Sequence, residues 1–301
     1  MPRLTFDDIS VQQMMQIGDA FVRGGNAEAA REVYRRALET PSPYRRALLI
    51  RQGLVSKLDG RLLPMMDILA AAERIDAPGS FVGEGLATWQ KQQPFHDDPR
   101  FLEIAQRHSS LLPLRNWQWN LQTALWAVRR SLAVRGDFVE LGVFKGHTTL
   151  FCADYLDFQQ QPKRWLLYDT FEGIPEDQLD PGWAKANETA YKDTFSYQEV
   201  RDRFAAFPNV EVIQGRVPEV FATRPAPEAI AFLHIDLNNA AAELAALDAL
   251  FDQVSPGGTI LFDDFGWVSA AVQHKAEKAW FAARGEEILM LPTGQGLYIK
   301  P

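Results

Sequence analysis

The sequence predicts a chain in two parts, an α-helical N-terminal region followed by an α/β domain on a mostly parallel sheet. From Gly136 onward, short apolar runs alternate with stretches of helical periodicity. Such alternation is typical of a parallel sheet that helices cover on both faces. Before about residue 110, the chain shows helical patterns without comparable apolar runs. We therefore predict an N-terminal region over residues 1–110 and an α/β domain over residues 111–301.

Seven apolar runs are the predicted strands of this sheet. They span residues 137–141, 164–169, 210–215, 230–236, 259–264, 286–291 and 296–300. Helical stretches separate most of them, at residues 147–158, 197–207, 218–223, 240–254 and 270–285. Only the short turn "PTGQG" joins the last two runs, so we expect an antiparallel C-terminal hairpin strand at one edge of a seven-stranded sheet.

The N-terminal region carries small or aromatic residues at helix-packing positions, followed by a weaker second occurrence of the pattern. The first unit has Gly18, Phe21, Ala30, Tyr34 and Ala37, with a break at Gly24-Gly25-Asn26, and the second has Gly53, Met65, Leu69 and Ala72. This resembles a tetratricopeptide helix pair, and an ordinary helical extension is the alternative. Two such units rarely stand alone, so we expect contact with the α/β domain or a homodimer through the helical region. A linker is expected within residues 81–115.

Composition excludes several classes of partner. The formal net charge is −8, which disfavours a sequence-independent grip on nucleic acid. No apolar run approaches the roughly 18 to 20 residues that a bilayer span requires, and the start "MPRLTFDDIS" lacks a signal-peptide pattern. Cys152 is the single cysteine, so no intrachain disulfide can form. We expect a cytoplasmic protein, although an exported protein poor in cysteine would fit as well.

A glycine-containing turn, "ELGVFKGHTT", follows the first strand. Gly142 allows close backbone approach to a ligand, and Gly146 allows a tight helix start whose N–H groups face the cleft. The dinucleotide fingerprint would need glycine in place of Phe144. The pattern suits S-adenosylmethionine better, because this ligand has no phosphate and carries an ammonium that Glu140 or backbone carbonyls would hold. An ordinary strand-to-helix turn is the alternative.

The next two strand ends add candidate groups for the same ligand, since ligands of open α/β sheets bind at the carboxyl ends of the strands. Asp169 is placed to accept hydrogen bonds from ribose hydroxyls, or else is a helix cap or turn acid. Gly215 would let an adenine lie against the backbone, and Arg216 flanks it or is a solvated surface residue. The residues that we assign to the cofactor site are Glu140, Gly142, Phe144, Gly146, Thr148, Asp169, Thr170, Gly215, Arg216 and Asp236.

Six separated motifs occur in an order and spacing that resemble one enzyme family. They are "GDFVELGVFKGHTT", "LLYDTFEGIP", "FPNVEVIQGRVPE", "FLHIDLNNAAAE", "VSPGGTILFDDFG" and "LPTGQGLYIK". Together they are similar to the macrocin O-methyltransferases, which are Rossmann-like class I enzymes that use S-adenosylmethionine and Mg²⁺. The resemblance covers residues 117–301. It implies methyl transfer to a hydroxyl of a sugar or natural-product scaffold, with Asp236, Asp263 and Asp264 as metal ligands and Asp236 also as the general base.

The acidic trio also makes physical sense without the resemblance. Carboxylates at neighbouring strand ends repel one another unless a cation or a proton compensates them, and a hard dication prefers oxygen ligands. Helix caps and turn acids are the alternative for Asp236, Asp263 and Asp264. One departure concerns the acceptor: many family members read Asp-Gly-Asp-Leu-Tyr where this chain has Asn238 and Ala240 at the third and fifth positions. We therefore do not transfer macrolide-sugar specificity.

Further candidates lie around this site. His274 is predicted to face the acceptor as a catalytic residue, with a helix-surface histidine as the alternative, and His147 either contacts the cofactor carboxylate or caps its helix. His234 is expected to be a core histidine. Residues 176–197 are expected to form a mobile lid in which Trp183 and Tyr191 stack on the acceptor, or a disordered surface loop. Two other functions stay open: a nucleotide-sugar or NAD-linked enzyme, and a non-catalytic adaptor that uses the helical repeats.

Overall fold

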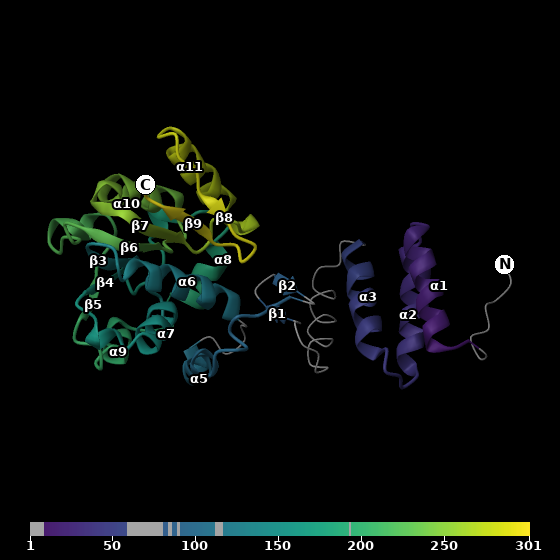
Figure 1. Cartoon of the computed structure of the whole chain (residues 1–301). Helices are drawn as coiled ribbons and strands as arrows, with labels where there is room; N and C mark the ends of the chain where they lie inside the picture. Colours follow the sequence, from purple (N-terminus) through teal and green to yellow (C-terminus); the bar gives the residue numbers. More distant parts are fainter. Residues whose placement is uncertain (1–8, 59–80, 84–85, 89–90, 112–116, 193) are drawn as a thin grey trace. The chain divides into compact units, whose positions relative to one another are not determined.

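Figure 1 shows the computed structural model, which describes residues 9–58, 81–83, 86–88, 91–111, 117–192 and 194–301. The chain divides into two compact units, Met1–Gln93 and Pro94–Pro301. This division falls earlier than the boundary expected at residues 110/111, because α5 (Pro99–Arg107) packs within the second unit. The Phe101 ring, for example, meets the Phe151 ring with 4.8 Å between centroids.

The first unit contains α1 (Val11–Arg23), α2 (Ala27–Glu39) and α3 (Arg45–Leu58). Ser10 forms a capping box at the start of α1, and Asn26 caps α2 after the predicted glycine break. Gly18 faces Tyr34 so closely that a Cβ would collide with the ring, so these predicted packing positions are confirmed. Met65, Leu69 and Ala72 lie outside the described residues. A hairpin of β1 (Phe81–Gly83) and β2 (Leu86–Thr88) occupies part of the expected linker, so that expectation was wrong there.

The second unit is the predicted α/β domain, with a seven-stranded sheet in the order β5-β4-β3-β6-β7-β9-β8 (Figure 1). The strands are β3 (Asp137–Leu141), β4 (Trp165–Asp169), β5 (Val210–Gln214), β6 (Ile230–Ile235), β7 (Val254–Phe262), β8 (Leu289–Met290) and β9 (Gly296–Ile299). The first five pair in parallel, whereas β9 is antiparallel to β7 and β8 to β9. The predicted antiparallel edge is confirmed, although β8 is shorter than the run at 286–291.

Helices connect the strands as the periodicity predicted. They are α6 (Gln118–Ser131), α7 (His147–Tyr155), α9 (Tyr197–Arg203), α10 (Ala240–Leu250) and α11 (Ala271–Ala282), with short turns η1 (Ser109–Leu111), η2 (Phe158–Gln160), η5 (Glu219–Ala222), η6 (Phe251–Gln253) and η7 (Val268–Ala270). Helix α6 contacts α7, and α10 contacts α11. None of the described helices is long and apolar enough to cross a bilayer.

The core of this unit explains why its strands are nearly continuous apolar runs. Val139, Leu141, Leu233, Ile235 and Ile260 are all buried in one cluster, and each such side chain contributes about 1.5–3 kcal/mol of burial free energy. The order of the strands reverses between β3 and β6, where one connection runs toward β4 and the other toward β7. Ligands of open α/β sheets bind at such a switch point, beyond the carboxyl ends of the strands.

Candidate active site

A pocket of about 500 Å³ opens at the carboxyl ends of β3, β4, β6 and β7. Its wall is formed by the turns that follow these strands and by residues 174–192, which we name the covering segment. Leu111 and Trp117 complete the lining from the side of α6. A cavity of this size at a switch point is typical of a small-molecule site.

The turn after β3 brings backbone from two strands together. Gly142 has φ +82°, and a Cβ there would collide with the carbonyl oxygen of Asp236 at the end of β6. Gly146 has φ +76° and begins α7, although it does not line the pocket itself. Phe144 adopts φ +49°, which is uncommon for a bulky residue. Gly146 begins its helix as the sequence predicted, whereas the close approach at Gly142 is to the backbone of Asp236, and its predicted approach to a ligand stays a prediction.

Asp169 is held by main-chain amides. Its Oδ2 accepts hydrogen bonds from the N–H groups of Val143 at 2.7 Å and Phe144 at 2.8 Å. Its Oδ1 accepts from Phe171 at 2.7 Å. Burial raises the pKa of Asp169, and these three amides oppose that rise. These bonds tie the turn after β3 to the turn after β4. A carboxylate offers about four acceptor positions, so the predicted ribose hydroxyls would compete with these amides for Asp169.

Glu140 is also engaged by the protein. It is 2% exposed, accepts a hydrogen bond from the Thr149 hydroxyl, and lies 2.9 Å from Nδ1 of His234. His234 is 2% exposed, so the expected core histidine is confirmed. Its Nε2 lies 3.8 Å from Oδ1 of Asp263. Both carboxylate oxygens of Glu140 thus have partners within the protein. The predicted contact between Glu140 and the cofactor ammonium would have to compete with its pairing to His234.

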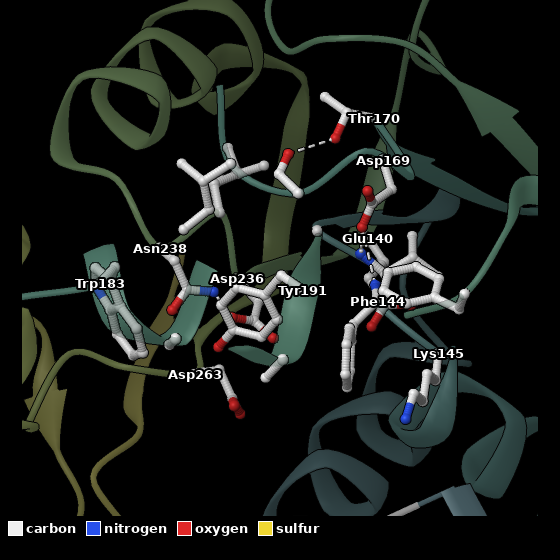
Figure 2. A pocket seen from close by; sticks show the side chains of 18 of the residues that line it. Glu140, Phe144, Lys145, Asp169, Thr170, Trp183, Tyr191, Asp236, Asn238 and Asp263 are labelled. Carbon is white, nitrogen blue, oxygen red and sulfur yellow. Dashed lines mark hydrogen bonds between the residues drawn. The ribbon is translucent and has the colours of Figure 1, made fainter. Parts of the chain in front are cut away.

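The three predicted metal ligands line this same pocket. Burial and the charges of Asp263 and Asp264 raise the pKa of Asp236 well above its ordinary value. Burial and the charge of Asp263 do the same to the pKa of Asp264. Figure 2 shows Asp236, Asn238 and Asp263 beside one another in the pocket. Within the described part of the chain, no three His, Cys, Asp or Glu side chains are arranged to enclose a metal ion.

These acids differ in how the protein compensates them. Asp263 accepts a hydrogen bond from Nε2 of Gln295 at 2.9 Å and faces His234. Asp236 accepts one from Nδ2 of Asn238 at 3.0 Å. The Oδ1 atom of Asn238 is buried without a hydrogen-bond partner among the described residues. An unmatched buried oxygen beside acids fits a site for a hard cation.

Comparison with known proteins identifies the chain. Residues 115–284, more than half of its length, match the family described as Macrocin-O-methyltransferase (TylF). The chain belongs to this family. A relative from Streptomyces olivaceus, 8-demethyl-8-(2,3-dimethoxy-alpha-L-rhamnosyl)-tetracenomycin-C 4'-O-methyltransferase, is 26% identical over 183 residues, which are 56% of this chain and 67% of the relative.

Solved structures of low sequence identity share the fold of this macrocin O-methyltransferase family member. The O-methyltransferase NovP is 21% identical with a TM-score of 0.52, over 60% of this chain and 79% of NovP. The calicheamicin methyltransferase CalS11 is 19% identical with a TM-score of 0.52, over 69% of this chain and 96% of CalS11. The chain is an S-adenosylmethionine-dependent O-methyltransferase, as its motifs predicted.

The other predicted cofactor residues of this methyltransferase are mostly in the pocket wall. Thr148 and Gly215 line it, and a Cβ at Gly215 would collide with Val220. Thr170 also lines it, with its hydroxyl 2.8 Å from the Gly173 carbonyl oxygen. Arg216 lines it but pairs with Asp177 of the covering segment at 2.7 Å. This ion pair could not be predicted from the sequence, because 39 residues separate its partners.

Of the two histidine candidates, only one reaches the pocket. His147 lines it and is 7% exposed, and its Nδ1 has no hydrogen-bond partner among the described residues. Burial and the charge of His108 lower the pKa of His147 to about 4. His274 is absent from the described pocket lining, and its Nδ1 lies 2.8 Å from the Phe265 carbonyl oxygen. The structure therefore does not bring His274 together with the other predicted catalytic groups.

The covering segment is helical, where the sequence predicted a lid or a disordered loop. It contains η3 (Glu176–Gln178), α8 (Ala184–Ala186) and the π-helical turn η4 (Asn187–Tyr191). Trp183 and Tyr191 line the pocket, and Tyr191 meets the Phe144 ring edge-on at 5.3 Å (Figure 2). The segment thus closes over the turn after β3, as a cover for the acceptor would.

Proposed function

We propose that this enzyme methylates a hydroxyl of a sugar unit on a natural-product scaffold and uses Mg²⁺ for the reaction. The observation that carries the proposal is the pocket itself, in which Asp236, Asp263 and Asp264 lie beside the turn after β3. The relative from Streptomyces olivaceus supports the acceptor class, because its name describes 4'-O-methylation of a rhamnosyl tetracenomycin.

The side chains present fit a hard dication by their chemistry. Burial raises the pKa values of Asp236 and Asp264, and the charge of the neighbouring Asp263 raises them further. A dication would relieve the repulsion. Asp236, Asp263 and Asp264 would hold the ion, and the unmatched Oδ1 of Asn238 is a further oxygen donor beside them. When bound, Mg²⁺ supplies Lewis acidity that makes an aliphatic hydroxyl easier to deprotonate.

Asp236 is the group of this chain best placed to take the hydroxyl proton. Burial is the largest cause of its raised pKa, and burial favours the protonated form of a carboxyl. Asn238 donates its amide hydrogen to Oδ1 of Asp236 and orients the carboxyl group. When bound, S-adenosylmethionine would supply an activated methyl group that passes to the hydroxyl oxygen, with S-adenosylhomocysteine as the leaving group. The role of the pocket wall would be to orient the acceptor hydroxyl for in-line attack.

The covering segment supplies an apolar surface for the acceptor. Trp183, Tyr191 and Phe144 present aromatic rings to the pocket. Aromatic faces pack against the C–H faces of sugars while polar groups bind the hydroxyls, and such a mixture favours a glycoside over a small charged metabolite. This wall also excludes water from the transferring methyl group.

An assay with labelled S-adenosylmethionine tests the proposal. The full chain is offered rhamnosyl glycosides, free rhamnose and catechol, each with MgCl₂ and with EDTA. We expect methylation of a glycoside that EDTA abolishes and added Mg²⁺ restores. Asp236→Asn should lose at least about a hundredfold in turnover, whereas Asp252→Asn, at an exposed position, should match the wild type. Full activity in EDTA would refute the metal, and methylation of catechol alone would refute the sugar acceptor.

A further inference from the structure

Helix α11 turns polar side chains toward the interior of the domain. Gln273 is 2% exposed and Glu277 is 1% exposed, and their spacing of four residues places them on one face of the helix. A helix that only packs against a sheet buries apolar residues there. Buried amides and carboxyls destabilise a fold unless they are hydrogen-bonded, so the partners of Gln273 indicate what this stripe does.

Gln273 joins two parts of the pocket wall through one amide. Its Oε1 accepts a hydrogen bond from the indole Nε1 of Trp183 in the covering segment, at 2.6 Å. Its Nε2 donates to Oε1 of Glu243 on α10, at 3.0 Å. The same Glu243 oxygen accepts the backbone N–H of Leu237, at 3.2 Å. Leu237 directly follows Asp236. A short chain of hydrogen bonds therefore connects the covering segment to the backbone beside the carboxylate that we propose as proton acceptor.

Glu243 lies beside a second buried acid, Glu277. Burial and the charge of Glu277 raise the pKa of Glu243, whereas burial raises the pKa of Glu277 and the hydrogen bond between the two side chains opposes that rise. The proton of the pair therefore lies on Glu243. Its Oε1 atom remains the acceptor for Gln273 and Leu237.

The covering segment has two further anchors on the same side of the pocket. Oδ2 of Asp180 accepts the N–H of Ala240 at the start of α10, at 3.0 Å. Gly182 lies so close to the Ser269 carbonyl oxygen that a Cβ would collide with it. The bond between Trp183 and Gln273 is an anchor made by a side chain of the cover that itself lines the pocket, and the ion pair between Asp177 and Arg216 is another anchor of the cover. Movement of the cover away from the pocket must break the bond to Gln273.

We propose that Trp183 and Gln273 are positioning residues for the methyl acceptor, which hold the covering segment closed and couple its position to the backbone beside Asp236. The acceptor part of this statement rests on the proposed function. Opening of the cover releases the amide of Gln273, and with it the support of Glu243 for Leu237. The covering segment therefore encloses the acceptor in the same step in which the backbone beside Asp236 is held in position.

Local hydrogen exchange and proteolysis of the full chain test the coupling without any acceptor. Trp183→Phe keeps an aromatic ring and removes the indole donor, and Gln273→Leu removes both amide bonds. Trp280→Phe is the matched control, because its indole on the same helix donates to Asp248 at 2.7 Å on the exposed side. Trypsin cuts at Lys185 and Lys192, which are exposed residues of the cover.

We expect Trp183→Phe to raise cleavage and amide exchange of the cover about fivefold, the effect of losing one hydrogen bond. Gln273→Leu should raise exchange of the cover and of the Leu237 amide together, whereas Trp280→Phe changes neither. Amides of β3 and β4 should exchange as in the wild type, which separates local release from general destabilisation. The affinity for S-adenosylhomocysteine, measured by calorimetry, should stay within twofold for Trp183→Phe.

Equal behaviour of Trp183→Phe and Trp280→Phe would overturn the anchoring role. Faster exchange of the cover in Gln273→Leu with an unchanged Leu237 amide would overturn the coupling. Because neither readout uses an acceptor or a metal, a failed glycoside assay removes only the acceptor part of this inference and leaves the anchoring and the coupling standing. Failure of the anchoring or the coupling leaves the proposed reaction intact.

Discussion

The Nδ1 atom of His234 lies 2.9 Å from the carboxylate of Glu140, and each of these side chains is only 2% exposed. The pair connects the strand before the cofactor turn to the acids of the pocket, because Nε2 of His234 faces Asp263 at 3.8 Å. Burial alone would lower the pKa of His234, but the carboxylates of Asp263 and Glu140 raise it well above its ordinary value. A buried imidazolium thus balances two buried carboxylates.

Removal of Glu140 is expected to leave that imidazolium without its main partner. Glu140→Gln keeps the shape of the side chain, and we expect it to lower the free energy of unfolding by about 3 kcal/mol near pH 6. Because the pKa of His234 is raised in the fold, its stabilisation is fully present below the unfolded value of about 6.5 and declines as pH rises through the folded value. Glu140→Gln should therefore weaken that decline.

Urea unfolding at pH 6 and pH 9 checks this expectation. Glu211→Gln is the control, because Glu211 pairs with Arg224 at the exposed surface, and such pairs contribute about 0–1 kcal/mol. If the two variants unfolded at the same urea concentration at pH 6, the buried pair would not have the strength inferred from its burial.

Gly142 and Gly285 provide a matched test of the close approach between the ends of β3 and β6. Both have left-handed backbone, with φ of +82° and +75°. A Cβ at Gly285 meets nothing within 4 Å, whereas one at Gly142 collides with the Asp236 carbonyl oxygen. We expect Gly285→Ala to cost about 1–2 kcal/mol from the backbone conformation alone. Gly142→Ala should in addition abolish S-adenosylmethionine binding in calorimetry, and binding within twofold of the wild type would contradict the role of this contact.

The sheet was predictable because its signals are local. Each strand is a short apolar run, and two of the parallel runs end at or next to an acid at the edge where ligands bind, at Asp169 and Asp236. The N-terminal hairpin at Phe81–Gly83 and Leu86–Thr88 was missed because three-residue strands carry no readable period. The helix start at Gly146 was predicted correctly, since its conformation follows from the turn itself.

The partners of the site residues were not predictable, because they lie far away in the sequence. Asp169 bonds amides about 25 residues earlier, and Trp183 bonds Gln273, which lies 90 residues later. His274 was placed toward the acceptor because its helix follows the turn that carries Asp263 and Asp264. The buried face of this helix carries Gln273 and Glu277. A single sequence gives no reason to turn such residues inward.

His147 is expected to make the fold sensitive to acid. Burial and the charge of His108 lower its pKa to about 4, so the unfolded chain binds a proton there at higher pH than the folded chain does. The free energy of unfolding has its full value, as far as His147 is concerned, above about pH 6.5, and it falls as pH falls toward 4. The loss due to His147 is about 2 kcal/mol between pH 7 and pH 5. The difference between the free energies of unfolding measured with urea at pH 7 and at pH 5 should shrink by this amount in His147→Gln. An unchanged difference would show that His147 takes up its proton equally in both states.

Asp263 and Asp264 are neighbours with opposite expected effects on stability. Asp263 has Gln295 and His234 as partners, so Asp263→Asn should destabilise the protein. The pKa of Asp264 is raised by burial and by the charge of Asp263, so its ionised form opposes folding as pH rises above the unfolded value of about 3.8. Asp264→Asn should therefore increase the free energy of unfolding, measured with urea at pH 7.5 in EDTA, by about 1 kcal/mol, while turnover with Mg²⁺ falls at least about a hundredfold. A functional site often retains such a strained charge at the expense of stability.

Lower stability of Asp264→Asn in EDTA would show that the carboxylate is already compensated within the protein, and the argument for a dication would lose its electrostatic basis.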